Sequence, residues 1–187
     1  METIRTFIAI DIPQEIKMEL DNLIAGLRPF APDIKWVKAA NLHLTLRFLG
    51  EIPKDSIRGL ADELSANLNG YGKFQAALSG LGGFPNLKRA RVIWAGTGMG
   101  TDRLIALAPL VEKSSINLGF GKADKSFSSH LTIGRVKFPK SLEKLASQIE
   151  STKFESDPFD VEEVAIFKSD LSPSGPKYTR LETIKIL

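Results

Sequence analysis

The chain has 187 residues, of which 43% are hydrophobic and 25% charged, with a formal net charge of +3 and no cysteine. These values are typical of one globular domain of ordinary size. They exclude disulfides and thiolate metal sites, and no apolar run reaches the ~18 to 20 residues that a membrane-spanning helix needs. We therefore expect a cytoplasmic protein without a membrane segment, whose small basic surplus suits an anionic ligand.

The first half of the chain alternates between strand and helix patterns. Residues 4–12 predict a strand rather than a secretion signal, because no cleavage-site pattern follows them. The apolar spacing of residues 13–27 predicts a helix with Pro13 in its first turn. Two short extended runs follow within 34–50, and a second amphipathic helix is expected over 53–68.

The second half repeats this alternation. The expected elements are strands over 74–84 and 90–98, a helix capped by Thr101 or Asp102 that runs to about 118, a strand over 129–138, a helix over 141–152, and strands over 159–171 and 178–186. Together the halves predict seven to nine strands and four helices, with no linker between domains. The glycine-rich stretch 96–100 matches neither common nucleotide-binding pattern and is interpreted as a turn.

The only two histidines of the chain stand in the same four-residue phrase. Residues 43–46 read HLTL and residues 130–133 read HLTI, so one phrase falls in each half. This repetition resembles a duplicated unit folded as two similar lobes, each a sheet with helices on its outer face. Strand alternation places the histidine and threonine of each phrase on one face, toward the space between the lobes, and the aliphatic residues on the other.

Two imidazoles across a cleft can divide acid–base work, because the pKa of histidine lies near neutrality. One neutral ring removes a proton from a nucleophile while the other, protonated, donates to a leaving group. A threonine hydroxyl beside each ring can stabilise oxygens that gain negative charge. A single histidine on a strand is more often structural, but the repeated threonine at the same spacing favours catalysis. The pattern fits in-line displacement at phosphorus.

With their flanking residues the two phrases resemble the motifs of the two-histidine (2H) phosphoesterase superfamily. HLTLRF at 43–48 and HLTIGR at 130–135 are similar to its branch of RNA 2′,3′-cyclic phosphodiesterases, a LigT-like group also called 2′-5′ RNA ligases. The resemblance extends over nearly the whole chain, from RTFIAIDIP to the tail IFKSDLSPSGPKYTRLETI. It implies a single bilobal α+β domain over 1–187, with two pseudo-symmetric and mainly antiparallel sheets and an active-site cleft between them.

The family implies a metal-independent reaction without cofactors, in which water opens a 2′,3′-cyclic phosphate and leaves a 2′-phosphate. By this resemblance His43 is the general acid for the departing O3′ and His130 the general base for water. The other implied roles are phosphate binding by Thr45, Thr132 and Arg135 and stacking of the terminal base on Phe48. The implied partner is RNA with 2′,3′-cyclic phosphate ends, with tRNA fragments as one candidate, and we expect a monomer.

One geometric difficulty accompanies these roles. Phe48 and Arg135 each lie five residues after their histidine, so strict alternation points them to the opposite face. Each strand must therefore end or contain a bulge in between. Among weaker candidates, Tyr178 could border the site. Arg47 shares the alternation of His43 but receives no role.

The basic stretch LKRAR, with Lys88, Arg89 and Arg91, could reach an RNA backbone or could be a solvated loop. Three other functions use the same features: reversible 2′-5′ ligation, hydrolysis of small cyclic nucleotides or 2′-5′ oligonucleotides, and binding of RNA ends without catalysis. Mass action favours hydrolysis over ligation, because water is abundant. The absence of HExxH and of cysteine argues against a zinc site.

Overall fold

The computed structural model describes residues 2–137, 142–173 and 175–186. The helices are α1 (Gln14–Leu27), α2 (Ser56–Leu68), α3 (Thr101–Asn117) and α4 (Glu143–Ser151), with 3-10 turns η1 (Arg28–Phe30), η2 (Ala39–Asn41) and η3 (Leu87–Arg89). The strands are β1 (Thr3–Asp11), β2 (Lys35–Trp36), β3 (His43–Pro53), β4 (Phe74–Ala76), β5 (Leu78–Phe84), β6 (Val92–Thr97), β7 (His130–Arg135), β8 (Phe159–Val161), β9 (Glu163–Ser172) and β10 (Gly175–Lys185).

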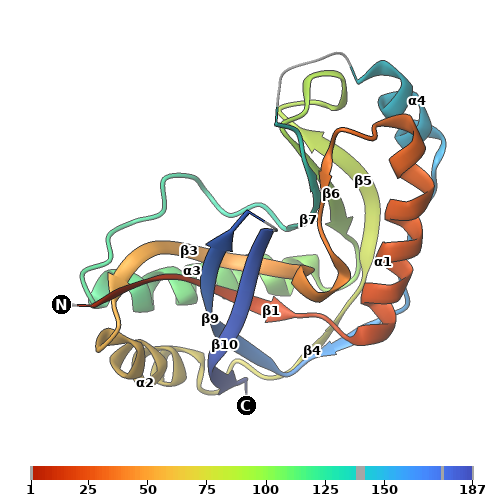
Figure 1. Ribbon diagram of the computed structural model, residues 1–187. Coiled ribbons are helices and arrows are strands. Elements are labelled where there is room, and N and C mark those ends of the chain that lie inside the picture. The colour runs from red at the N-terminus through yellow and green to blue at the C-terminus, as the bar shows by residue number, and fades with distance from the viewer. Residues whose placement is uncertain (1, 138–141, 174, 187) are drawn as a thin grey trace.

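Two four-stranded sheets form the two lobes seen in Figure 1. The first sheet has the order β10-β9-β1-β3 and the second β2-β7-β6-β5, while β4 and β8 form a separate pair. All pairings within them are antiparallel. The predicted α+β architecture of two antiparallel sheets with helices is thus confirmed.

Each lobe takes elements from both halves of the sequence. Helix α1 packs against α4 beside the sheet of β5, β6 and β7, whereas α3 packs against α2 beside β3 (Figure 1). Strand β2 precedes β3 in the chain but pairs with β7 in the other sheet. The short segment from β2 to β3 therefore crosses from one lobe to the other.

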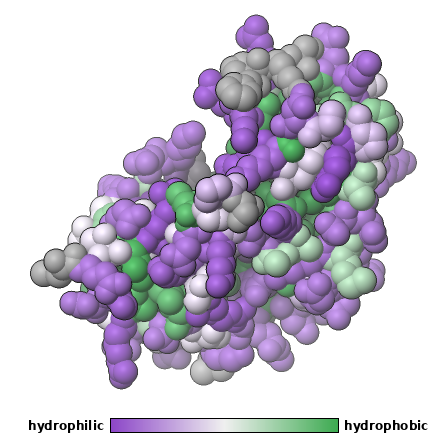
Figure 2. Space-filling model, viewed as in Figure 1, coloured by the Kyte–Doolittle hydropathy of each residue, from purple (hydrophilic) through white to green (hydrophobic). Residues whose placement is uncertain are grey.

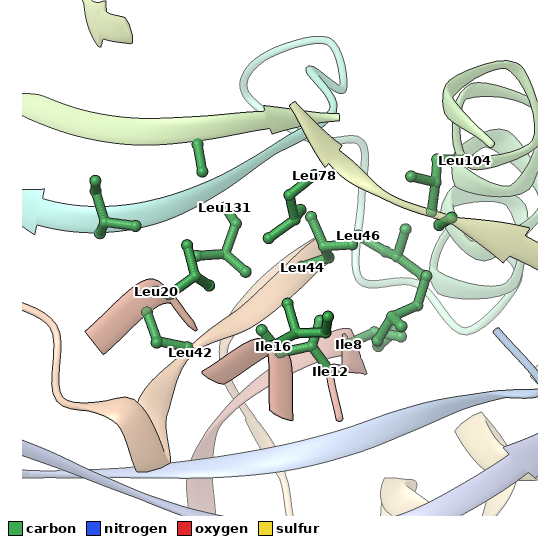
Figure 3. Close-up of a cluster of buried hydrophobic side chains, with 14 of the residues drawn as sticks. Ile8, Ile12, Ile16, Leu20, Leu42, Leu44, Leu46, Leu78, Leu104 and Leu131 are labelled. Atoms are coloured by element: carbon green, nitrogen blue, oxygen red, sulfur yellow. The ribbon is translucent and has the colours of Figure 1, made fainter. Parts of the chain in front are cut away.

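One buried apolar cluster runs through both lobes. It includes Leu44 and Leu46 from β3, Leu131 from β7 and Leu20 from α1, which lie close together in Figure 3. Burying a leucine of this kind contributes roughly 1.5 to 3 kcal/mol. The aliphatic residues of both histidine phrases therefore hold the two motif strands against a common core.

Two of the predicted strands are each divided, which raises the number of described strands to ten instead of seven to nine. The run over 74–84 forms β4 and β5, and the run over 159–171 forms β8 and β9. A continuous apolar run does not reveal that its two ends pair with different partners, as β4 does with β8 and β5 with β6. The prediction of four α-helices is confirmed for the described residues.

The cap of α3 lies one or two residues earlier than the sequence pattern predicts. Gly100 occupies the cap position with φ of 76°, and a Cβ there would lie 2.3 Å from the carbonyl oxygen of Gln75. Only glycine fits such a left-handed, crowded position. Thr101 is the first helical residue, and its hydroxyl donates to the carbonyl of Gly98 at 2.7 Å.

The predicted end of one strand at 138 and the predicted start of one helix at 141 lie outside the described residues. Among the described helices, none combines the length and the apolar character that crossing a membrane requires.

Candidate active site

The two histidine phrases begin β3 and β7, and both follow the predicted alternation. His43 and Thr45 are half-buried while Leu44 and Leu46 are buried, and the second phrase has the same sequence of exposure. The strands β3 and β7 contact each other although they belong to different sheets. Their histidines and threonines therefore lie on the sheet faces that are turned away from the main core.

A bulge falls at the last residue of each phrase. In β3 the pairing with β1 passes from Thr45 to Arg47 and skips Leu46. In β7 the pairing with β6 passes from Thr132 to Gly134 and skips the intervening residue. One extra residue reverses the alternation beyond it. The predicted bulges are thus present, and Phe48 and Arg135 return to the faces of their histidines.

The two imidazoles are held in the same tautomer. Nδ1 of His43 lies 2.7 Å from the carbonyl oxygen of Asn41, and Nδ1 of His130 lies 2.7 Å from that of Ser128. A carbonyl oxygen only accepts, so the Nδ1–H donates in both rings and Nε2 is left for a substrate. The side chain of Asn41 in turn donates to the carbonyl of Pro176 at 2.9 Å, which ties η2 to β10.

An aromatic platform supports His43 on the face of the first sheet. Phe7 stacks on the imidazole with ring centroids 4.8 Å apart, and Tyr178 meets it edge-on at 5.2 Å. Phe167 lies beside both rings, with its centroid 5.3 Å from Phe7 and 6.4 Å from the imidazole. These residues belong to a second, smaller buried cluster separate from the main core. The platform fixes the ring plane of His43 and removes it from water.

His130 has a less enclosed position. Phe84 meets its ring edge-on at 5.0 Å and also packs against Trp94 at 5.4 Å. Beside it, a hollow of about 550 Å³ is lined by Trp94, Phe127, Ser128 and Ser129, among other residues. Figure 2 shows the surface notched between the two lobes, with mainly hydrophilic residues around the notch.

Burial lowers the pKa of both histidines. For His43 it lowers the pKa from 6.5 to about 4, against the opposing effects of the Asn41 carbonyl and of Asp11. The pKa of His130 is lowered for the same reason. Both rings are therefore neutral at neutral pH when no ligand is bound, and one of them has to gain a proton before it can act as an acid.

Arg135 lies within electrostatic reach of both histidines. Its positive charge contributes to the lowered pKa of His43 and of His130, and opposes the raised pKa that burial gives Tyr178. The residue is exposed and forms no side-chain hydrogen bond or ion pair with the described part of the chain. The hydroxyls of Thr45 and Thr132 likewise form no hydrogen bond with the described residues. The charge and both hydroxyls are therefore available to an anion.

Phe48 is 46% exposed, and the guanidinium of Arg5 lies 4.6 Å from the centre of its ring. The ring is thus not a core aromatic but a surface group beside a cation. Arg47, by contrast, is buried by the bulge. It pairs with Glu112 on α3 at 3.3 Å and donates to the carbonyl of Gly121 at 3.1 Å, which is a structural role.

The LKRAR stretch follows the edge of the second sheet. Lys88 and Arg89 belong to η3, which packs against α4, and the carbonyl of Lys88 accepts from the amide of Leu142. Within the described residues no three His, Asp or Glu side chains come close enough together to hold a metal ion.

The sequence interpretation missed the groups that orient the histidines. Phe7 and Phe167 looked like ordinary strand residues, and nothing local relates them to His43. Asn41 and Ser128 each act through a backbone carbonyl two residues before a histidine. That shared offset was visible in the sequence, but the residue type carries no signal because the side chain is not involved.

The chain is similar to known proteins over nearly its whole length. The family described as LigT like phosphoesterase matches residues 10–94 and 98–178. An RNA 2′,3′-cyclic phosphodiesterase of Thermotoga maritima is 37% identical over 93% of this chain and 91% of its own. One of Methanothermobacter thermautotrophicus is 30% identical over 98% and 99%.

Solved structures give the same result. The protein TT0787 of Thermus thermophilus is similar with a TM-score of 0.79 and 29% identity, over 98% of both chains. The LigT of Escherichia coli complexed with 3′-AMP is similar with a TM-score of 0.77 and 26% identity, over 99% of both chains. The matched fold, the two extended motifs and the near full-length relatives show that this chain belongs to the LigT-like phosphoesterase family.

Proposed function

We propose that the protein hydrolyses the 2′,3′-cyclic phosphate at RNA ends to a 2′-phosphate by acid–base catalysis between His43 and His130. One observation carries this proposal: two equivalent imidazoles have the same fixed tautomer and lie within reach of one unpaired guanidinium, that of Arg135. The relatives named as RNA 2′,3′-cyclic phosphodiesterases support the same reaction.

In the proposed reaction His130 accepts a proton from water through Nε2, and the water oxygen forms a bond to phosphorus. The bond from phosphorus to O3′ breaks, and His43 donates a proton from Nε2 to that oxygen. The 2′-phosphate remains on the ribose. The division of labour between the rings follows the family resemblance, because the two motifs are nearly equivalent.

Because the pKa of His43 is low in the free protein, the bound substrate must also favour the protonated ring. A protonated imidazole beside a bound phosphate anion is stabilised, so the anion raises the pKa of the ring that serves as acid. Thr45 and Thr132 donate to the non-bridging oxygens, and Arg135 binds the same group through charge-assisted hydrogen bonds. No cofactor enters this scheme.

Phe48 supplies a stacking surface for the terminal base, and this contact is indifferent to base identity because every base has a π-face. The substrates are RNA ends of the kind that tRNA fragments carry, and the protein acts as a monomer. Hydrolysis is favoured over 2′-5′ ligation because water is present at much higher concentration than a second RNA end.

The decisive experiment incubates a short RNA that ends in a 2′,3′-cyclic phosphate with the protein in EDTA and resolves the 2′- and 3′-phosphate products. We expect a 2′-phosphate product that is lost in His43→Ala and in His130→Ala. Activity that needs added zinc or magnesium would contradict the metal-independent scheme. RNA binding without turnover in the wild type, with the same affinity in His43→Ala, would instead identify a binding module.

A further inference from the structure

A second positive charge lies directly beside Arg135. Lys35 on β2 is the register partner of Arg135 on β7, so the two side chains leave the same face of the second sheet. Both residues are exposed. Like charges placed directly opposite each other destabilise a sheet, and nothing in the described part of the chain neutralises either of these by an ion pair or side-chain hydrogen bond.

This face is the one that carries His130. Arg135 is also the register partner of Val92, and Val92 is the partner of Phe84. The four residues thus form one row across the sheet, and Phe84 at its end touches the imidazole of His130 edge-on. Trp36, the next residue after Lys35, is opposite Gly134 and packs toward the main core. The lysine therefore points to the side of the cleft.

Lys35 lies one strand farther from the phosphate-binding Thr132 than Arg135 does. Because the bulge adds one residue to β7, Arg135 lies only two positions of the partner strand beyond Thr132, which is roughly 7 Å, and Lys35 lies another strand away, about 4.8 Å. The long guanidinium side chain of Arg135 can span back to the catalytic phosphate. The lysine, on the edge strand, is placed instead for a neighbouring negative charge.

We propose that Lys35 is a specificity residue that binds the phosphodiester on the 5′ side of the terminal nucleotide. The proposal rests on the proposed function and deepens it, because it makes an oligonucleotide end a better substrate than a free cyclic mononucleotide. A mononucleotide has no phosphate at that place, and its scissile phosphate is already held by the threonines and Arg135. Lys35 and Arg135 then bind consecutive phosphates of one strand, and the anion between them removes their mutual repulsion.

The test compares three substrates: adenosine 2′,3′-cyclic phosphate, the dinucleotide ApA ending in the cyclic phosphate, and the same dinucleotide with an uncharged methylphosphonate linkage. We expect Lys35→Gln to lower kcat/KM about fivefold for the charged dinucleotide, as for a partly exposed ion pair. The other two substrates should be unaffected. Lys35→Arg should retain most of the preference for the charged dinucleotide. In the wild type this preference should decrease as salt is added.

Lys144 provides a matched control, because it is an exposed lysine on α4, which lies beside the same sheet and away from the cleft (Figure 1). Lys144→Gln should change none of the three values. Equal losses on all three substrates for Lys35→Gln, or no loss on any, would overturn the proposal. Equal wild-type values for the charged and the uncharged dinucleotide would do the same.

Binding separates this proposal from the proposed function. The wild type and Lys35→Gln are titrated calorimetrically with 2′-AMP and with ApA carrying a terminal 2′-phosphate. A weaker Kd of the variant for the dinucleotide alone supports the role of Lys35, even if no cyclic substrate is turned over. Absence of turnover with this binding pattern would refute only the reaction, whereas equal Kd changes for both ligands would refute the role of Lys35.

Discussion

Phe48 and Arg135 occupy equivalent positions in the two lobes, each five residues after its histidine and each returned to the histidine's face by one bulge. The equivalence is geometric and not chemical, since an aromatic ring stands in one lobe and a guanidinium in the other. The two motifs are nearly the same, but the residues that follow them on the same face differ. In the proposed reaction this asymmetry orients the RNA end.

The guanidinium should contribute to every cyclic substrate. Arg135→Gln removes charge-assisted hydrogen bonds to the phosphate, and we expect a loss of about 1.5 to 3 kcal/mol in transition-state binding. The measurement is kcat/KM on the mononucleotide and on the dinucleotide. A loss confined to the dinucleotide would place this residue on the neighbouring phosphate and contradict its assigned role.

The aromatic ring should act mainly on binding. Phe48→Leu removes a stacked base contact of roughly 1 to 3 kcal/mol, and KM should rise while kcat changes little. All four terminal bases should be affected to a similar extent. An unchanged KM for every base would show that Arg5, which covers one face of the ring, prevents stacking.

The pH profile follows from the two lowered pKa values. The acid must be protonated and is lost as pH rises above its pKa, while the base must be neutral and is lost as pH falls below its pKa. Both values lie below 6.5 in the free protein, so kcat/KM should be bell-shaped with a maximum below that pH. If His130 were the acid and His43 the base, the maximal kcat/KM would differ, but the pH of the maximum would not.

A profile measured over about pH 3 to 9 would show both limbs of the bell, because the acidic limb extends down to the His43 pKa of about 4. We expect kcat/KM to fall steadily above about pH 6.5, where a free imidazole loses its proton. A flat profile, or a maximum above neutrality, would contradict paired catalysis by imidazoles with these pKa values. The pH of the maximum should be higher for kcat than for kcat/KM, because the bound phosphate raises the pKa of the acid.

Burial of neutral His43 should make folding stability depend on pH. Between pH 6.5 and about 4 the unfolded chain binds a proton that the folded protein does not, so stability falls as the pH decreases through this window. The shift corresponds to about 3 kcal/mol at most. His43→Gln should therefore show a smaller loss of unfolding free energy between about pH 7 and 4 than the wild type, measured by urea denaturation. Equal losses would show that the ring is solvated.

The second bulge can be tested at Gly134. A Cβ at this position would lie 3.0 Å from side-chain atoms of Ile34 and of Trp36, so Gly134→Ala should displace the β2–β7 pairing and cost about 1 to 3 kcal/mol. Activity should fall with it, because Arg135 follows directly. Gly59→Ala is the control, since its nearest atom, Cδ2 of Leu118, is 4.0 Å away and the residue lies in α2.

That control variant should gain about 0.5 to 1 kcal/mol, because alanine loses less conformational freedom than glycine in a helix. Thermal and urea denaturation of both variants measure the difference. Similar stabilities of Gly134→Ala and the wild type would mean that Trp36 moves aside without cost, and would weaken the link between close packing and the position of Arg135.

The sequence by itself determined the local features of the site. Period-2 alternation placed His43 and Thr45 on one face and their aliphatic neighbours in the core, because side-chain direction along a strand is a local property. Together with the role that the family resemblance implies for Phe48, it also required that the strand end or contain a bulge before that residue. The helices could be predicted for the same reason, since an apolar stripe at helical spacing needs no knowledge of its partner.

Only the tertiary structure decided which distant segments meet. The pairing of β2 with β7 put Lys35 opposite Arg135, and the pairing of β1 with β9 put Phe167 beside Phe7 under the imidazole of His43. No local pattern specifies such partners, because strand pairing depends on the register between segments far apart in the chain. The low pKa of His43 arises in the same way, since burial is produced by the assembled lobes and not by the four residues of the motif.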